Sequence, residues 1–303
     1  MSRPNLDEQI LVDTSDEDSL CDAQSIIDSN FSLTSTTRDY LYENGRRYHA
    51  YRLGHYPMPN DEEEQDRLAF MHHLFKLLVG GDLYRAPILN DGPPKRILDV
   101  GTGTGIWALE MADDFPDAEI TFTPAEAFDY IHARSLGGGI GDWNRFLRQA
   151  YRHTKPGGWV EIQEYETWIR SDDGTIQRAP MLLDWQQKID AASTQFGRPM
   201  NVASSLAGWM QEVGFVNVTD DSYKCPVGSW PKSPRLKEIG RVGKITLYEA
   251  VEPYTLALFT RVLGWSGEDA QEYVNKVRAD LLRPDIHVYV VYHYVYGRRP
   301  ANS

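Results

Sequence analysis

This sequence of 303 residues has little of what would mark a secreted, membrane-spanning or nucleic-acid-binding protein. Its two cysteines, Cys21 and Cys225, lie far apart and provide neither a disulfide framework nor a zinc-binding spacing. No apolar run resembles a signal peptide, and the most apolar stretch, 286–296, is about half as long as a bilayer-spanning helix. A net charge of −13 argues against direct binding to nucleic acid or to an anionic membrane. We therefore expect a cytoplasmic or nuclear protein.

The beginning of the chain is also poor in apolar residues. Residues 1–36 contain eight acidic residues and one arginine among many serines and threonines. Such a segment cannot bury enough apolar surface to offset the entropy lost on ordering. We predict a disordered acidic tail over 1–37, and a simple solvated tail is favoured over a phosphorylation switch.

The remainder of the chain alternates between strand-like and helix-like patterns. A capping residue and carboxylates at 60–64, followed by apolar residues at helical spacing, predict a helix that ends at Gly80-Gly81. Further helices are expected at 106–115, from Asp142 to a break at 155–158, at 203–213 and at 266–282, and strands at 96–100, 128–133, 159–165, 215–218 and 285–296. This alternation predicts an α/β fold with a parallel sheet. We expect 38–94 to form a helical lid or cover and 95–300 to form the main domain with helical insertions.

A glycine-rich turn follows the first of these strands, in the sequence Asp99-Val-Gly-Thr-Gly-Thr-Gly105. Glycine allows a sharp turn and a close approach of the backbone to a ligand. The helix behind the turn presents unpaired N–H groups to a carboxylate, and Asp99 can bind an ammonium group. An amino-acid-bearing ligand such as S-adenosylmethionine fits both features. The spacing GxGxG does not meet the dinucleotide pattern GxGxxG, and a turn that serves packing alone is the alternative.

Motifs over most of the chain from Tyr40 to Pro300 carry a family resemblance. They are the segments 43–49 (ENGRRYH), 56–62 (YPMPNDE), 98–107 (LDVGTGTGIW), 128–134 (FDYIHAR), 149–153 (QAYRH), 155–159 (KPGGW) and 294–300 (YVYGRRP). In these motifs the sequence resembles the LaeA-like methyltransferases of filamentous fungi, which are associated with secondary metabolism or its regulation. The resemblance implies a class I methyltransferase, Rossmann-like fold with an antiparallel last strand, and S-adenosylmethionine as cofactor. It also implies a cofactor site formed by Asp99, Gly101, Thr102, Gly103, Gly105 and Tyr48.

The sequence departs from this pattern after the first helix of the domain. Residues 118–120 begin the expected second strand, but Phe128 already begins what resembles the fourth. Two parallel strands in one sheet need a crossover of about a dozen residues, and 124–127 supplies four. We predict that the second and third strands are lost or truncated, which leaves the first strand at or near a sheet edge, covered by 40–81. An exon missing between the codons of Ile120 and Thr121 is an alternative origin of the gap.

The same gap removes the acidic residue that normally binds the ribose hydroxyls. Glu119 lies at the wrong end of the shortened strand, and Glu126 is a poor substitute. Losing two charge-assisted hydrogen bonds weakens cofactor binding by about 3 kcal/mol, or about a hundredfold. We therefore expect an impaired cofactor site.

Candidate catalytic groups lie where open α/β sheets bind ligands, at the carboxyl ends of the strands. His132 is the candidate general base, with a packed strand histidine as the alternative. Glu161 and Glu164 fall on opposite faces of the next strand and cannot act as a pair. Adjacent His72 and His73 cannot share a helix face, so no metal site is expected.

Two functions from different classes remain open. The first is an S-adenosylmethionine-dependent methyltransferase that acts on a small secondary-metabolite acceptor or a protein. The second is a non-catalytic regulator or scaffold that keeps the methyltransferase fold and binds a regulatory protein partner.

Overall fold

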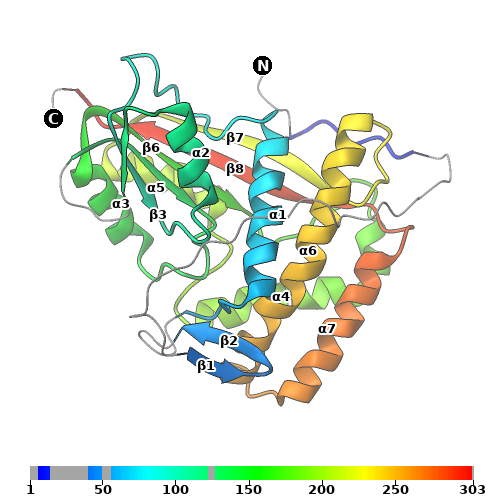
Figure 1. The fold of residues 1–303 in the computed structure, drawn as a ribbon. Coiled ribbons are helices and arrows are strands. Elements are labelled where there is room, and N and C mark those ends of the chain that lie inside the picture. Colours follow the sequence, from blue (N-terminus) through cyan, green and yellow to red (C-terminus); the bar gives the residue numbers. More distant parts are fainter. Residues whose placement is uncertain (1–5, 14–39, 50–55, 122–126, 302–303) are drawn as a thin grey trace.

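The computed structural model describes residues 6–13, 40–49, 56–121 and 127–301 (Figure 1). Its strands are β1 (Tyr40–Glu43), β2 (Arg46–His49), β3 (Arg96–Val100), β4 (Glu119–Thr121), β5 (Phe128–Arg134), β6 (Thr154–Tyr165), β7 (Val216–Val227) and β8 (Val288–Arg298). Its helices are α1 (Glu62–Leu78), α2 (Ile106–Asp114), α3 (Trp143–His153), α4 (Pro180–Gln195), α5 (Leu206–Val213), α6 (Pro234–Arg261) and α7 (Gly267–Leu282), with 3-10 turns at Thr175–Arg178 and Ala203–Ser205.

Six strands form one sheet in the order β4-β3-β5-β6-β8-β7. β4, β3, β5 and β6 are parallel, whereas β8 runs antiparallel to both of its neighbours, β6 and β7. This confirms the predicted parallel sheet with an antiparallel last strand. The carboxyl ends of β3, β5 and β6 therefore meet at one edge, which is where ligands bind in open α/β sheets.

The second strand of the domain is short, as predicted. β4 contains three residues and pairs with β3 only from Glu119 to Thr121. The described residues between β4 and β5 hold no further strand, and Glu126 lies outside the described residues. β3 is consequently the second strand from the edge. The cover over β3 differs from the predicted one, which was residues 40–81. Helix α1 packs mainly against α6, and Leu83 and Ile88 pack with α2 over Ile97 of β3.

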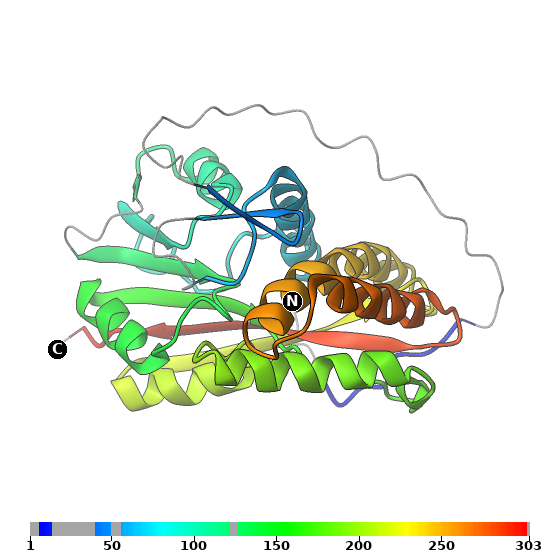
Figure 2. The ribbon, with the colours of Figure 1, turned by 90° about the horizontal axis from the view of Figure 1, so that it is seen from below.

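Helices cover both faces of the sheet (Figure 2). On one face, α3 and α5 bury Trp143, Leu147 and Met210 against β5 and β6. On the other, α1 and α6 pack together, and α4 and α7 join α6 in the largest apolar cluster. The buried face of α3 consists of Trp143, Leu147 and Ala150.

The segment predicted as a helical cover contains a β-hairpin before its helix. Asn44 and Gly45 both have positive φ, 51° and 78°, which suits a two-residue hairpin turn. Arg46 then binds both carboxylate oxygens of Asp61, the N-cap of α1, at 2.6 Å each, and Glu252 of α6 at 3.1 Å. This buried guanidinium joins the hairpin, α1 and α6. The division at 94/95 stays a prediction.

Part of the expected acidic tail is packed on the sheet. Ile10 is buried with Tyr289 and Val291 of β8, and Val12 pairs with Pro231 as an isolated bridge. Residues 1–5 and 14–37 of that predicted tail lie outside the described residues. Within the described ranges no helix is long and apolar enough to cross a membrane.

Candidate active site

The glycine turn after β3 requires glycine for two physical reasons. Gly101, Gly103 and Gly105 have φ of +74°, +58° and +81°, in the left-handed region that other residues rarely adopt. A Cβ on Gly101 would also lie 2.4 Å from Cδ2 of Leu136. Gly105 is the N-cap of α2 and supplies no side chain, so the first N–H groups of α2 have no capping side chain. The turn therefore places a helix N-terminus at the carboxyl edge of the sheet.

Asp99, the carboxylate before this turn, is held by His132 of the adjacent strand. Nδ1 of His132 donates to Oδ1 of Asp99 at 2.8 Å, and both side chains are buried. The His132 ring stacks on Trp107 of α2, with the ring centroids 3.6 Å apart and the planes 6° apart. Among the described residues, neither Oδ2 of Asp99 nor Nε2 of His132 has a hydrogen-bond partner. The structure thus brings Asp99, His132 and the glycines together as the sequence predicted, with an unsatisfied carboxylate oxygen beside the turn.

A chain of polar contacts continues from the end of β5 toward the surface. Arg134 donates to Nδ1 of His72 at 3.0 Å, and Nε2 of His72 lies 3.1 Å from Glu110, which also binds Lys76. Burial and the positive charge of Arg134 lower the pKa of His72 to about 4, so this ring is neutral and carries its proton on Nε2. These contacts join α1, α2 and β5 behind the glycine turn.

The two histidines on α1 point to different environments. His72 is buried, whereas His73 is exposed. The described residues contain no group of three or more His, Cys, Asp or Glu side chains that could hold a metal ion.

Glu161 and Glu164 of β6 lie on opposite faces, as their spacing predicted. Glu161 accepts hydrogen bonds from the backbone N–H groups of Arg85 and Ala86 at 2.9 and 2.7 Å. Glu164 accepts from the backbone N–H of Leu136 and, at 3.1 Å, of Gly137, in the loop after β5. Burial raises the pKa of Glu164 to about 8.

An unsatisfied arginine on α1 was not predicted. The Nε and Nη2 atoms of Arg67 bind both oxygens of Glu64 at 2.8 and 2.6 Å, and both side chains are buried. Nη1 of Arg67 is buried with no hydrogen-bond partner among the described residues. The guanidinium lies over the ring of Tyr254 on α6, 5.4 Å from its centroid. Arg67 lies near the Asp/Glu-rich start of a helix, and in the sequence this pattern indicated only helix capping.

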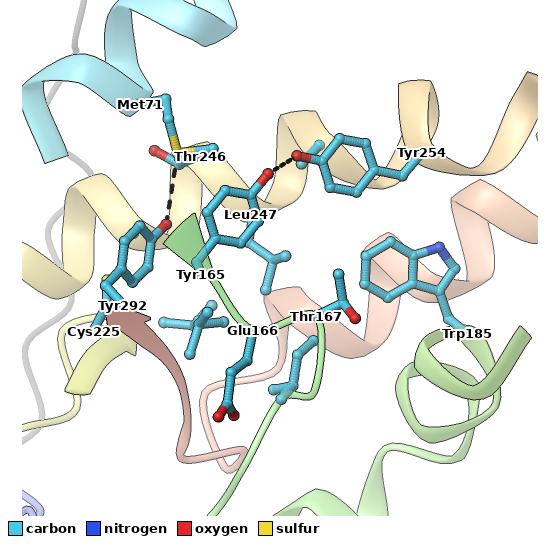
Figure 3. Close-up of a pocket in the computed structure, with 15 residues that line it drawn as sticks. Met71, Tyr165, Glu166, Thr167, Trp185, Cys225, Thr246, Leu247, Tyr254 and Tyr292 are labelled. Carbon is cyan, nitrogen blue, oxygen red and sulfur yellow. Dashed lines mark hydrogen bonds between the residues drawn. The ribbon is translucent and has the colours of Figure 1, made fainter. Parts of the chain in front are cut away.

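Tyr254, the residue under this guanidinium, lines a mainly apolar pocket between α1, α6 and the sheet (Figure 3). It encloses about 30 Å³, which is room for about two water molecules. The hydroxyls of Tyr165 and Tyr254 are hydrogen-bonded to each other on its wall, and Tyr292 donates to the sulfur of Met71 at 3.7 Å. Burial raises the pKa of Tyr165 and Tyr254, so both phenols stay protonated. Tyr165 ends β6, so the pocket begins at the ligand-binding edge of the sheet.

Helix α1 connects this pocket to the glycine turn. Cδ1 of Leu68 lies 3.8 Å from the position that a Cβ on Gly103 would take. Met71, one turn further along the same helix face, lines the pocket. The turn and the pocket are therefore neighbours along a single helix.

Tyr48 lies apart from these groups. Its ring is buried in the hairpin against the guanidinium of Arg261, 4.9 Å from the ring centroid, and its hydroxyl has no hydrogen-bond partner among the described residues. No described contact joins Tyr48 to the glycine turn. Its predicted role in cofactor binding stays a prediction.

Comparison with known proteins decides the family. Residues 70–220 match the family model described as a methyltransferase domain. The chain is 40% identical over 296 residues to the methyltransferase pytC of Aspergillus terreus, covering 89% of this chain and 91% of pytC. This chain belongs to the LaeA-like fungal methyltransferases. It is 33% identical to the secondary metabolism regulator LAE1 of Cochliobolus heterostrophus, covering 85% of this chain and 94% of LAE1.

Among solved structures, the methyltransferase is similar to phosphoethanolamine N-methyltransferase 2 of Haemonchus contortus in complex with S-adenosylhomocysteine. The identity is 16% and the TM-score 0.37, with 78% of this chain and 52% of that chain covered.

As a member of this family, the chain is an S-adenosylmethionine-dependent methyltransferase of the class I fold. The residues present fit the methionine end of that cofactor. The orphaned oxygen of Asp99 suits the ammonium group, and the uncapped start of α2 suits the carboxylate. When bound, S-adenosylmethionine supplies an electrophilic methyl group. Within the described ranges, no equivalent carboxylate for the ribose lies at the end of β4: Glu119 is at the start of β4, exposed, and paired with Arg96 at 3.0 Å.

Proposed function

We propose that this methyltransferase transfers a methyl group to a small aromatic or apolar acceptor that carries an oxygen, within fungal secondary metabolism. The observation that carries the proposal is the contact of one helix, α1, with both the glycine turn and the pocket that Tyr165 and Tyr254 line. The guanidinium of Arg67 lies over the ring of Tyr254 on the pocket wall, and its unpartnered N–H would suit an acceptor oxygen. The name of pytC, a methyltransferase, supports the same assignment.

Methyl transfer by in-line displacement depends mainly on positioning, and the chain provides for it on both sides. In this proposal Asp99, Gly101, Thr102, Gly103 and Gly105 hold the methionine end of the cofactor. The stacked His132 ring, which donates to Asp99, fixes the direction of that carboxylate. As a general base, His132 would have to leave its stack on Trp107, so a positioning role fits its contacts better.

The enclosed space is smaller than the 300–1,000 Å³ of typical ligand pockets, so binding an acceptor requires α1 to move away from α6. Water leaves the pocket on binding, which strengthens the interaction of Arg67 with an acceptor oxygen. The incomplete ribose site predicts a weak cofactor affinity.

A labelling experiment tests the proposal. Full-length protein is incubated with methyl-labelled S-adenosylmethionine and the small-molecule extract of a fungal culture that lacks this gene. We expect label in the small-molecule fraction, and an R67M variant should retain cofactor binding but lose transfer. Label found only on protein, or an R67M variant as active as the wild type, would contradict the proposal.

A second candidate function is a regulator that binds a protein partner, in the nucleus or the cytoplasm. The 33% identity to LAE1, named as a secondary metabolism regulator, favours it, as does the small volume of the pocket. The two candidates differ in a single measurable property: a non-catalytic regulator gives no labelled product with any small-molecule fraction, even though it captures a partner.

A further inference from the structure

A second cavity, distant from the glycine turn, is lined by cations in a chain whose net charge is −13. It has a volume of about 130 Å³ and a largely polar lining. It lies at the start of α6, whereas the hairpin and Tyr48 lie at the end of this 28-residue helix (Figure 1). Its lining shares Val227 with the acceptor pocket, and none of its charged residues lines that pocket.

The floor of this cavity is a single face of α6. Lys237, Arg241 and Lys244 follow one another at spacings of four and three residues, which places all three side chains on the same side of the helix. Like charges at these spacings repel one another and destabilise a helix unless an anion lies between them. The face thus presents a row of three positive charges to the cavity.

The walls come from the opposite ends of the chain. On one side, Asp13 follows the Val12–Pro231 bridge and its N–H donates to the carbonyl of Trp230 at 2.6 Å. On the other side, Arg283 and His287 flank the end of α7 and the start of β8. The indole N–H of Trp230 is buried and, within the described part of the chain, has no acceptor.

The charges in the cavity are only partly balanced. Lys237 forms an ion pair with Asp13, Arg283 pairs with Asp285 at 2.9 Å, and His287 lies 2.7 Å from Asp173. Within the described residues, Arg241 and Lys244 form no ion pair or hydrogen bond that would neutralise them. Arg241 and Lys244 therefore line the cavity as two positive charges without a counter-ion among the described residues.

We propose that this cavity binds a phosphate group, either inorganic phosphate or a phosphate monoester. Arginine offers a planar pair of donors that matches phosphate oxygens, and lysine adds a point charge beside it. The Asp13 carboxylate at Lys237 shows that the rim already accepts an anionic oxygen. The volume accommodates one phosphate group and a few waters but not a larger ligand in full, so a monoester would leave its organic part outside.

Titration of the full-length protein with inorganic phosphate, at constant ionic strength, tests the proposal. We expect saturable binding by calorimetry, and about tenfold or more weaker binding in the double variant R241Q/K244Q. The matched control R145Q/R148Q removes two exposed arginines at the same spacing on α3 and should bind phosphate like the wild type. Because phosphate also stabilises proteins by exclusion from their surface, the comparison between these double variants isolates the site.

A variant that gains affinity keeps the test independent of folding defects. D13N removes the carboxylate that competes for Lys237 and should tighten phosphate binding. Glucose 6-phosphate and a phosphoserine peptide, titrated separately, distinguish a metabolite from a modified side chain by which of the two binds more tightly. Equal phosphate affinity in the wild type and R241Q/K244Q, or no saturable binding at millimolar phosphate, would overturn the proposal.

Discussion

Replacing Asp99 by asparagine is expected to weaken binding of S-adenosylmethionine about ten- to hundredfold. Oδ2 of Asp99 is buried and unpartnered, so it is the carboxylate oxygen available to the cofactor ammonium. A hydrogen bond between charged groups contributes about 1.5–3 kcal/mol, and each 1.4 kcal/mol is a factor of ten in affinity. The amide oxygen of asparagine still accepts from Nδ1 of His132, so we expect the fold to persist in D99N.

Calorimetric titration of wild type, D99N and E119Q measures this difference. Glu119 is exposed and paired with Arg96 at the far end of β4, so E119Q removes the same charge without touching the proposed site. We expect E119Q to bind S-adenosylmethionine like the wild type. If D99N also bound like the wild type, or if E119Q lost affinity to the same extent, the assignment of the methionine end to Asp99 would be refuted.

Three further predictions concern stability, measured by chemical denaturation. Two carboxylates raise the pKa of His293 to about 9, against an unfolded value near 6.5. The protonated ring therefore contributes roughly 3 kcal/mol to the free energy of unfolding, and this contribution is complete below pH 6.5 and lost as the pH rises through 9. H293Q should flatten the pH dependence of stability in that window. E64Q leaves Arg67 buried without a counter-charge and should lower the free energy of unfolding by about 3–5 kcal/mol, whereas an unchanged value would show that Arg67 is solvated. G101A, strained at positive φ and in contact with Leu136, should lose about 1–3 kcal/mol, and a smaller loss would mean that the turn relaxes.

The mainly parallel sheet was predictable because most of its strands and the helices between them carry local sequence signals. Asp61 and Ser266 cap α1 and α7 as their sequences indicated, and β3 ends at the glycines. The short link before Phe128 predicted from chain length that the second strand is lost or truncated, and β4 has three residues. The expected break at 155–158 is a bulge within β6, since Phe128 pairs with Thr154 and Tyr130 with Trp159.

Helix α6 was not predicted because its sequence contains residues that disfavour a helix. It contains Pro253 and two glycines, Gly240 and Gly243, which are poor helix formers. Both glycines are needed where the end of β7 meets the helix: a Cβ on Gly240 would lie 2.0 Å from the carbonyl oxygen of Gly228, and one on Gly243 would lie 2.5 Å from that of Pro226. Tertiary packing, which no short sequence window contains, selects the helix here.

The candidate site likewise has a part that the sequence predicted and a part that depends on tertiary packing. Asp99, His132 and the glycines lie on consecutive parallel strands, so their proximity followed from the pattern. Arg67, Tyr165 and Tyr254 come from elements that meet only after α6 has packed on α1. The Asn44-Gly45 pair was a readable hairpin signal that the helical expectation for this segment overlooked.

Direct titration of the full-length chain with S-adenosylmethionine tests the central claim, that a truncated sheet still supports a methyltransferase. Among the described residues, an unpartnered oxygen of Asp99 suits the methionine end of the cofactor, and no carboxylate for the ribose lies at the end of β4. We therefore predict saturable binding at a single site with a submillimolar dissociation constant, weakened in D99N. No binding of S-adenosylmethionine at millimolar concentration would contradict the account.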